Sequence, residues 1–226
     1  MTSSVYNPAE GVFSPSHIHR SKGRGVVGVD IDDVLADSTP AWVSFASNIM
    51  SSPELCEKYT IPNRLWVRSY QGTYQALWVM KKAVPYYYYR LMKEVYRESE
   101  TKRTLGLFSD SIPFLTWAKS EGVRIILLTK RSQMCSKLTY DWVERNKIPY
   151  DEIIFSKEKH IRILERFPKL LFMVEDNMDI ANAVGQWGYH VYLRNNCYNS
   201  DYLSDRNVFR IRNLMEIVDI WKNRLS

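Results

Sequence analysis

The stretch VVGVDIDDVLADS (residues 26–38) joins a short apolar run to a group of carboxylates. The run is rich in β-branched residues, which favours a strand, and it stops at Asp30, Asp32 and Asp33. Carboxylates repel one another and lose solvation when they are buried. A chain with a formal net charge of +6 that gathers its acids here needs a cation, basic side chains or water to offset the repulsion.

Outward from this stretch, strand-like and helix-like segments alternate after residue 105. Strands are expected at 26–32, 123–129, 152–156, 170–176 and 189–195. Helices are expected at 111–122, 132–148, 159–167, 177–188 and 213–225. Such alternation predicts an α/β fold, a Rossmann-like doubly wound parallel sheet with helices on both faces.

Residues 40–104 interrupt the alternation and read as a small helical cap inserted after the first strand. The predicted core domain then comprises residues 25–39 and 105–226. Residues 1–24, rich in Ser, Gly and Pro, are expected to be a flexible leader.

The composition is that of a globular protein, with 45% hydrophobic and 25% charged residues in a chain of 226. No apolar stretch approaches the roughly 18–20 residues of a membrane span, and the first residues lack the apolar segment of a secretory signal. Three widely spaced cysteines favour free thiols in a reducing cytoplasm. The positive charge indicates a solvated basic surface or an anionic ligand, from a phosphomonoester to nucleic acid.

Chemically active side chains follow the predicted strands. Ligands of doubly wound sheets bind beyond the carboxyl ends of the strands, so groups placed there meet at one edge. These groups are Asp30 and Asp32, Thr129 and Lys130, Lys157 or Lys159, and Glu175 and Asp176. Carboxylates, a hydroxyl and a lysine together predict a Mg²⁺ site for phosphate chemistry. Asp33, Asp37 and Asp179 are expected only to cap helices or shape turns.

The four segments of sequence that contain these groups resemble, in order, the four motifs of the haloacid dehalogenase superfamily. DIDDVLADS (30–38) resembles its first motif, an Asp-x-Asp that ends the first strand, and IILLTKRS (125–132) its second, a Ser or Thr at a strand end. The lysine at 157–159 fits the third motif, and MVEDN (173–177) fits the acidic pair of the fourth.

Within the superfamily the chain resembles the 5′(3′)-deoxyribonucleotidases and related nucleotidases. These proteins carry a helical cap between the first two motifs, and EIIFSKEK (152–159) matches a family stretch that favours Lys159 as the catalytic lysine. The likeness continues to Tyr198 and Asn199. LWVRSYQG (65–72) resembles a cap segment that faces the nucleobase, which makes Trp66 a candidate substrate contact. Asp33 departs from the family glycine, and Ser38 from its usual aromatic residue.

The resemblance implies a Mg²⁺-dependent 5′-nucleotidase for nucleoside monophosphates. Asp30 would form an aspartyl-phosphate, and Asp32 would act as general acid and then base. Asp30, the Asp32 carbonyl, Asp176 and, through water, Glu175 would hold the metal. Thr129, Lys130 and Lys159 would hold the phosphate.

Two alternatives stay open beside the nucleotidase interpretation. The first is a phosphatase for another phosphoester, such as a phosphosugar or, less favoured, a nucleic-acid 3′-phosphate. The second is a non-catalytic binding module on the same fold. We expect a cytoplasmic location and no association with membranes. Whether the protein forms a homodimer is left open.

Overall fold

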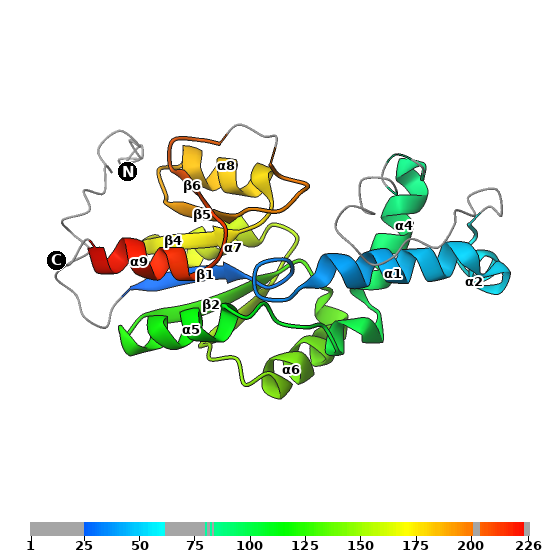
Figure 1. Cartoon of the computed structure of the whole chain (residues 1–226), viewed down its shortest axis with the longest axis horizontal. Coiled ribbons are helices and arrows are strands. Elements are labelled where there is room, and N and C mark those ends of the chain that lie inside the picture. The colour runs from blue at the N-terminus through cyan, green and yellow to red at the C-terminus, as the bar shows by residue number, and fades with distance from the viewer. Residues whose placement is uncertain (1–24, 62–79, 81, 83, 201–203, 224–226) are drawn as a thin grey trace, which may run out of the picture.

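A computed structural model describes residues 25–61, 80, 82, 84–200 and 204–223, and its centre is one parallel sheet (Figure 1). Six strands lie in the order β3-β2-β1-β4-β5-β6, and every neighbouring pair is parallel. The strands are β1 (Val26–Asp30), β2 (Arg124–Thr129), β3 (Glu152–Phe155), β4 (Leu170–Glu175), β5 (Val191–Arg194) and β6 (Val208–Ile211). The predicted α/β doubly wound sheet is therefore confirmed.

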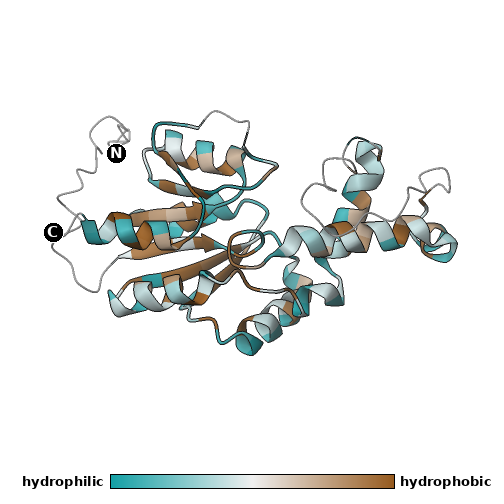
Figure 2. Cartoon of the chain, viewed as in Figure 1, coloured by the Kyte–Doolittle hydropathy of each residue, from teal (hydrophilic) through white to brown (hydrophobic). Residues whose placement is uncertain are grey.

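Helices cover both faces of the sheet and close two hydrophobic clusters. The helices are α5 (Ser111–Ser120), α6 (Ser136–Arg145), α7 (Lys159–Arg166), α8 (Met178–Gln186) and α9 (Met215–Asn223). Side chains of α5, α6 and α9 pack in one cluster, and those of α7 and α8 in the other. Between their end residues the central strands are apolar (Figure 2), as expected for strands buried on both faces.

The segment between β1 and α5 forms helices beyond the carboxyl end of β1 (Figure 1). They are α1 (Ser38–Ser51), α2 (Pro53–Lys58), α4 (Tyr86–Arg97) and the short 3₁₀ helix η4 (Glu100–Arg103). They enclose a third hydrophobic cluster, around Trp42, Met50 and Met92. We call this helical segment the insert. Trp66 lies outside the described residues.

The tyrosine run in α4 shows how the insert presents its surface. Four consecutive helical residues point in different directions, so they cannot all be core. Tyr89 is buried, whereas Tyr86 and Tyr87 are 73% and 70% exposed. Among the helices that the structure describes, none is long and apolar enough to cross a membrane.

Candidate active site

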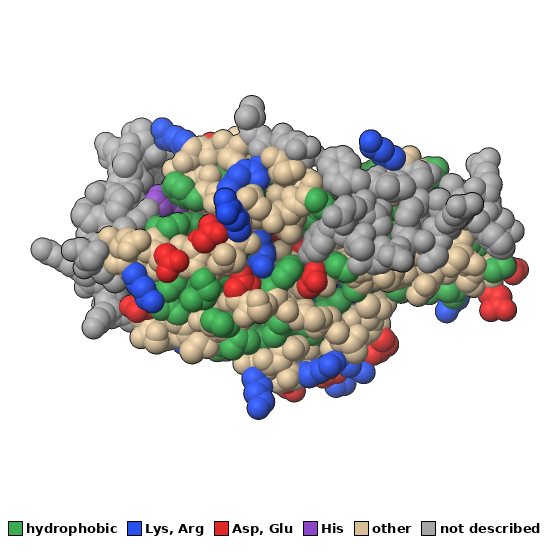
Figure 3. All heavy atoms as spheres, in the orientation of Figure 1, with side chains coloured by type: hydrophobic (Ala, Val, Ile, Leu, Met, Phe, Trp, Pro, Cys, Tyr) green, Lys and Arg blue, Asp and Glu red, His purple; other side chains and the backbone are tan. Residues whose placement is uncertain are grey.

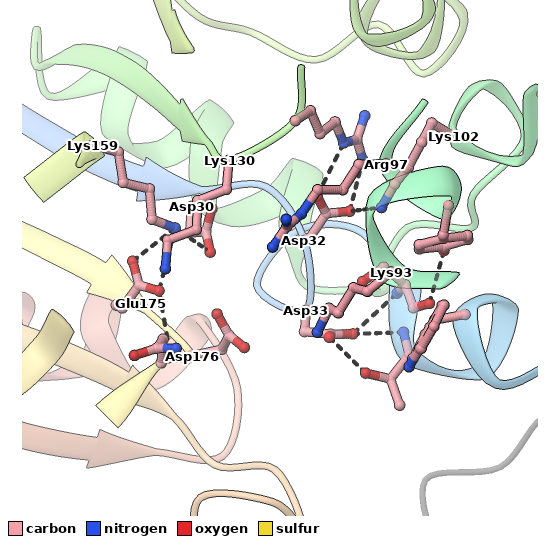
Figure 4. A pocket seen from close by; sticks show the side chains of 16 residues that line it. Asp30, Asp32, Asp33, Lys93, Arg97, Lys102, Lys130, Lys159, Glu175 and Asp176 are labelled. Carbon is pink, nitrogen blue, oxygen red and sulfur yellow. Dashed lines mark hydrogen bonds and ion pairs between the residues drawn. The ribbon is translucent and has the colours of Figure 1, made fainter. Parts of the chain in front are cut away.

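The acidic residues meet because β1 and β4 are parallel neighbours. Asp30 is the last residue of β1, Glu175 is the last of β4, and Asp176 follows it. One carboxylate oxygen from each of the three lies within 4.8 Å of the other two. Asp30 and Glu175 are buried, and Figure 4 shows the three side chains at the same end of the sheet.

Lys159, the first residue of α7, lies among these acids and is itself buried. Its Nζ lies 2.5 Å from Oδ2 of Asp30 and 3.0 Å from Oε2 of Glu175. Burial alone would lower the pKa of Lys159, but the Asp30 and Glu175 charges raise it above its ordinary value. Lys157 is exposed and lines a neighbouring hollow, so Lys159 is the lysine that reaches the acids.

Three carboxylates lie close together around Lys159 and repel one another. Burial, and then the Asp30 charge, raises the pKa of Glu175 to about 7. Burial and the Glu175 charge raise the pKa of Asp176 well above its ordinary value. Oε2 of Glu175 is buried and accepts no hydrogen bond from the residues that the structure describes, although Lys159 is close. Hard oxygen ligands that repel one another in this way fit a divalent cation.

Asp176 accepts hydrogen bonds from two residues that follow β5. The Tyr198 hydroxyl donates a 2.5 Å hydrogen bond to Oδ2 of Asp176, and the Asn199 amide donates to its carbonyl at 2.8 Å. Such contacts fix the direction in which a potential metal ligand points. Only the family likeness of the run through Tyr198 and Asn199 indicated them from the sequence.

Asp32 is paired with basic side chains instead of joining the acidic cluster. Arg131 Nε and Nη2 donate to its two carboxylate oxygens, each at 3.0 Å, and Lys102 Nζ donates to Oδ1 at 3.0 Å. Burial opposes ionisation, but Arg131 and Lys102 outweigh it and hold the pKa of Asp32 far below its ordinary range. In this arrangement the Asp32 carboxylate is ionised and accepts hydrogen bonds. To act as a general acid, it would first have to bind a proton.

The sequence reasoning missed both partners of Asp32. Arg131 comes directly after Thr129 and Lys130, at the carboxyl end of a predicted strand. Its position could therefore have marked it as a residue of the site. Lys102 lies in η4 of the insert, 70 residues from Asp32 along the chain, and no local pattern marks it.

Asp33 begins the insert as a helix-capping residue, in line with its expected role. Its Oδ1 accepts hydrogen bonds from the backbone N–H groups of Ser38 and Thr39, and its Oδ2 from the Thr39 hydroxyl at 2.6 Å. Its φ is +63°, in the left-handed region where a glycine is normally favoured. The three bonds compensate for the backbone strain of the departure from the family glycine.

The acidic cluster and the ion-paired Asp32 line one pocket of about 170 Å³. Asp30, Glu175 and Asp176 lie on one side, with Lys130 and Lys159, and Arg97 and Lys102 on the other (Figure 4). Burial, and then the Lys159 charge, lowers the pKa of Lys130.

Thr129 is fully buried behind the pocket and does not line it. Its Oγ1 accepts a 3.1 Å hydrogen bond from the backbone N–H of Arg131. The side chain therefore shapes the loop that carries Lys130 and Arg131, and its expected direct contact with phosphate stays a prediction.

The parallel sheet with a helical insert after β1 is a fold that this chain shares with solved haloacid dehalogenase-like (HAD) proteins. Comparison with solved structures shows that fold. A HAD phosphatase from Thermococcus onnurineus aligns with a TM-score of 0.53 at 16% identity, over 88% of this chain and 98% of that one. A HAD-superfamily hydrolase from Geobacter sulfurreducens aligns with a TM-score of 0.53 at 17% identity, over 87% and 98%.

The same fold also holds other chemistry. An L-2-haloacid dehalogenase from Xanthobacter autotrophicus, with chloropropionic acid covalently bound, aligns with a TM-score of 0.51 at 11% identity, over 87% of this chain and 98% of that one. Among curated proteins, a nucleotidase from Clostridium acetobutylicum is 24% identical over 163 residues, 69% of this chain and 84% of that protein. No protein-family model matches the chain.

Proposed function

We propose that the protein is a Mg²⁺-dependent phosphomonoesterase that acts on nucleoside monophosphates through an aspartyl-phosphate on Asp30. The observation that carries the proposal is the meeting of Asp30, Lys159, Glu175 and Asp176 in one pocket. The fold shared with a HAD phosphatase supports a phosphatase, and the curated nucleotidase relative supports a nucleotide substrate.

In the first step a carboxylate oxygen of Asp30 attacks phosphorus, and the bond from phosphorus to the ester oxygen breaks. The electron pair leaves with that oxygen, which takes a proton from Asp32. In the second step Asp32 accepts a proton from water as the water oxygen attacks phosphorus. Phosphate leaves, and the Asp30 carboxylate is restored.

Asp32 must separate from Arg131 and Lys102 before it can carry that proton. An incoming phosphate dianion competes for the same two cations, since both line the pocket. Substrate binding would therefore release Asp32, which would take up a proton from water before the first step. Lys159 holds one oxygen of Asp30 in place and, with Lys130, offsets the charge of the phosphate.

Asp30, Asp176 and Glu175 would hold Mg²⁺, with the backbone carbonyl of Asp32. When bound, the cation reduces the repulsion between the anionic nucleophile and the anionic phosphate.

A phosphatase for a different phosphoester is the second candidate, since the site residues recognise phosphate and leave the alcohol unspecified. A nucleic-acid substrate is less favoured. Among the residues coloured in Figure 3, Lys and Arg side chains are interspersed with Asp and Glu and form no continuous basic track on that face. The cytoplasmic location and a homodimer stay predictions.

Phosphate release from the purified protein with Mg²⁺ tests the function. The panel contains ribo- and deoxynucleoside monophosphates, sugar phosphates, a 3′-phosphorylated oligonucleotide and a haloacid. We expect turnover of nucleoside monophosphates and no halide release. Release from sugar phosphates alone would favour the second candidate, and halide release or inactivity on the whole panel would refute a phosphatase.

A further inference from the structure

A second hollow of about 250 Å³ adjoins the candidate active site. Three side chains, Arg97, Lys130 and Arg131, line both cavities. The rest of its wall comes from the loops after β2 and β3, including Ser132, Ser156 and Lys157, and from the end of α4. We call this hollow the side pocket. Because the cavities share these three residues, they are immediate neighbours.

The side pocket carries more positive than negative charge. Four basic side chains line it, against the two carboxylates Glu94 and Glu98. Arg97 is paired with Glu94, and Arg131 with Asp32. Within the described part of the chain, Lys130 and Lys157 make no salt bridge. An anion between these two lysines would gain charge-assisted hydrogen bonds.

The side pocket also spans the boundary between the insert and the sheet. Arg97 ends α4, whereas Lys157 lies between β3 and α7. Glu94 of α4 is affected from both sides of this boundary. Its pKa is lowered first by its hydrogen bond from Arg97 and also by the charge of Lys157. A bound anion would contact both sides and hold the insert against the sheet.

We propose that the side pocket binds a second phosphate of the substrate, so that the preferred substrate is a phosphomonoester that carries another phosphate group. This inference rests on the proposed function and specifies its substrate class. The reacting phosphate lies at Asp30, and the shared residues Lys130 and Arg131 lead from it to Lys157. A nucleoside 3′,5′-bisphosphate has this chemistry.

Binding without turnover gives the sharpest test. In the Asp30→Asn protein with Mg²⁺, calorimetry compares thymidine 3′,5′-bisphosphate with thymidine 5′-monophosphate. We expect the bisphosphate to bind about tenfold more tightly, which corresponds to about 1.4 kcal/mol. Lys157→Gln in that background should remove most of the advantage, and Lys157→Glu should reverse it.

Lys169→Gln is the matched control. Lys169 is also exposed, but it precedes β4 and so lies at the amino ends of the strands, away from the site at their carboxyl ends. This variant should therefore keep the advantage. Fructose 1,6-bisphosphate against fructose 6-phosphate repeats the comparison without a base. The same advantage there supports recognition of the second phosphate itself.

Equal affinities for the bisphosphate and the monophosphate would overturn the inference, as would an advantage that survives both Lys157 changes. Turnover by the unmutated protein separates this failure from that of the proposed function. Hydrolysis of monophosphates with no bisphosphate preference would refute only the side pocket. Tight, Lys157-dependent bisphosphate binding without any phosphate release would refute only the phosphatase.

Discussion

Each carboxylate oxygen of Asp30 contacts a described residue, which fixes the orientation of the side chain. Oδ1 accepts a 2.8 Å hydrogen bond from the backbone N–H of Ile31, and Oδ2 lies 2.5 Å from Lys159 Nζ. A positioned carboxylate needs little reorganisation before it attacks a bound phosphate, which is what preorganisation contributes to a rate.

Asp30→Asn should abolish turnover and leave the protein folded. The amide nearly matches the carboxylate in shape but is a poor nucleophile, so kcat should fall by about a thousandfold or more. Lys159 keeps Glu175 as a partner, and the cluster loses one of three mutually repelling acids. Phosphate release and a thermal melt measure the two effects. Wild-type release from a folded variant would contradict the covalent mechanism.

At the scale of elements, the continuous apolar runs were the features most readily predicted from sequence. The segments 123–129 and 170–176 correspond to β2 and β4, because strands buried on both faces have no polar positions to blur them. The sixth strand, Val208–Ile211, was not predicted. It has four residues with a buried-exposed pattern, too short for its period to be recognised.

The basic side of the pocket could not be predicted in the same way. Strand ends in a parallel sheet converge by topology, so the sequence could place Asp30 and Glu175 at one edge. Lys102 and Arg97 come from η4 and α4, and their approach to the site depends on how the insert packs on the sheet. That packing is a tertiary property with no local signature.

Helix α7 carries a histidine whose protonation should oppose folding. His160 stacks on Trp187, and its Nδ1 is buried without a hydrogen-bond partner in the described part of the chain. Burial, and then the charges of Lys130 and Lys159, lowers the pKa of His160. The unfolded state therefore binds the proton more readily, and stability falls as the pH decreases through the ordinary histidine range.

His160→Phe should lessen this acid sensitivity. Because phenylalanine does not titrate, we expect the melting temperature to fall less between about pH 7.5 and 5.5 than in the wild type. His160→Asn also removes the titration but loses the ring, so a reduced fall in both variants identifies protonation as the cause. An unchanged fall in both would contradict it.

The insert is expected to determine substrate specificity, and Trp66 is the residue predicted to contact the base. A stacked base contributes on the order of 1–3 kcal/mol by alanine substitution. Trp66→Ala should therefore lower kcat/KM for nucleotides by roughly ten- to a hundredfold, and change it much less for p-nitrophenyl phosphate.

Tyr87→Ala is the control for this change, since Tyr87 is an aromatic residue of the insert with 70% exposure. It should leave the ratio between the two substrates unchanged. If Trp66 were core instead, Trp66→Ala would lower the melting temperature and both activities equally. Equal losses in a folded protein would remove the base contact from the proposal.

At the scale of the whole molecule, the acidic cluster joins elements distant in sequence, so a cation bound there should stabilise the entire fold. Asp30 belongs to the first strand, whereas Glu175 and Asp176 follow about 145 residues later. The unfolded chain cannot present these three ligands together. Mg²⁺ should bind the folded state preferentially and raise its free energy of unfolding.

At a Mg²⁺ concentration of 100 times Kd the stabilisation is about 2.7 kcal/mol, which should raise the melting temperature by roughly 5–10 °C in a chain of this size. Asp176→Asn keeps the shape of one ligand and removes its charge, so this variant should need much more Mg²⁺ for the same rise. Asp179→Asn, at an exposed acid three residues away, should respond like the wild type. Calorimetric melts across a Mg²⁺ titration, with excess chelator as the zero point, measure all three proteins. A wild-type melting temperature independent of Mg²⁺, or equal responses in the two variants, would contradict a cation site at this cluster and leave lysine side chains to offset its charge.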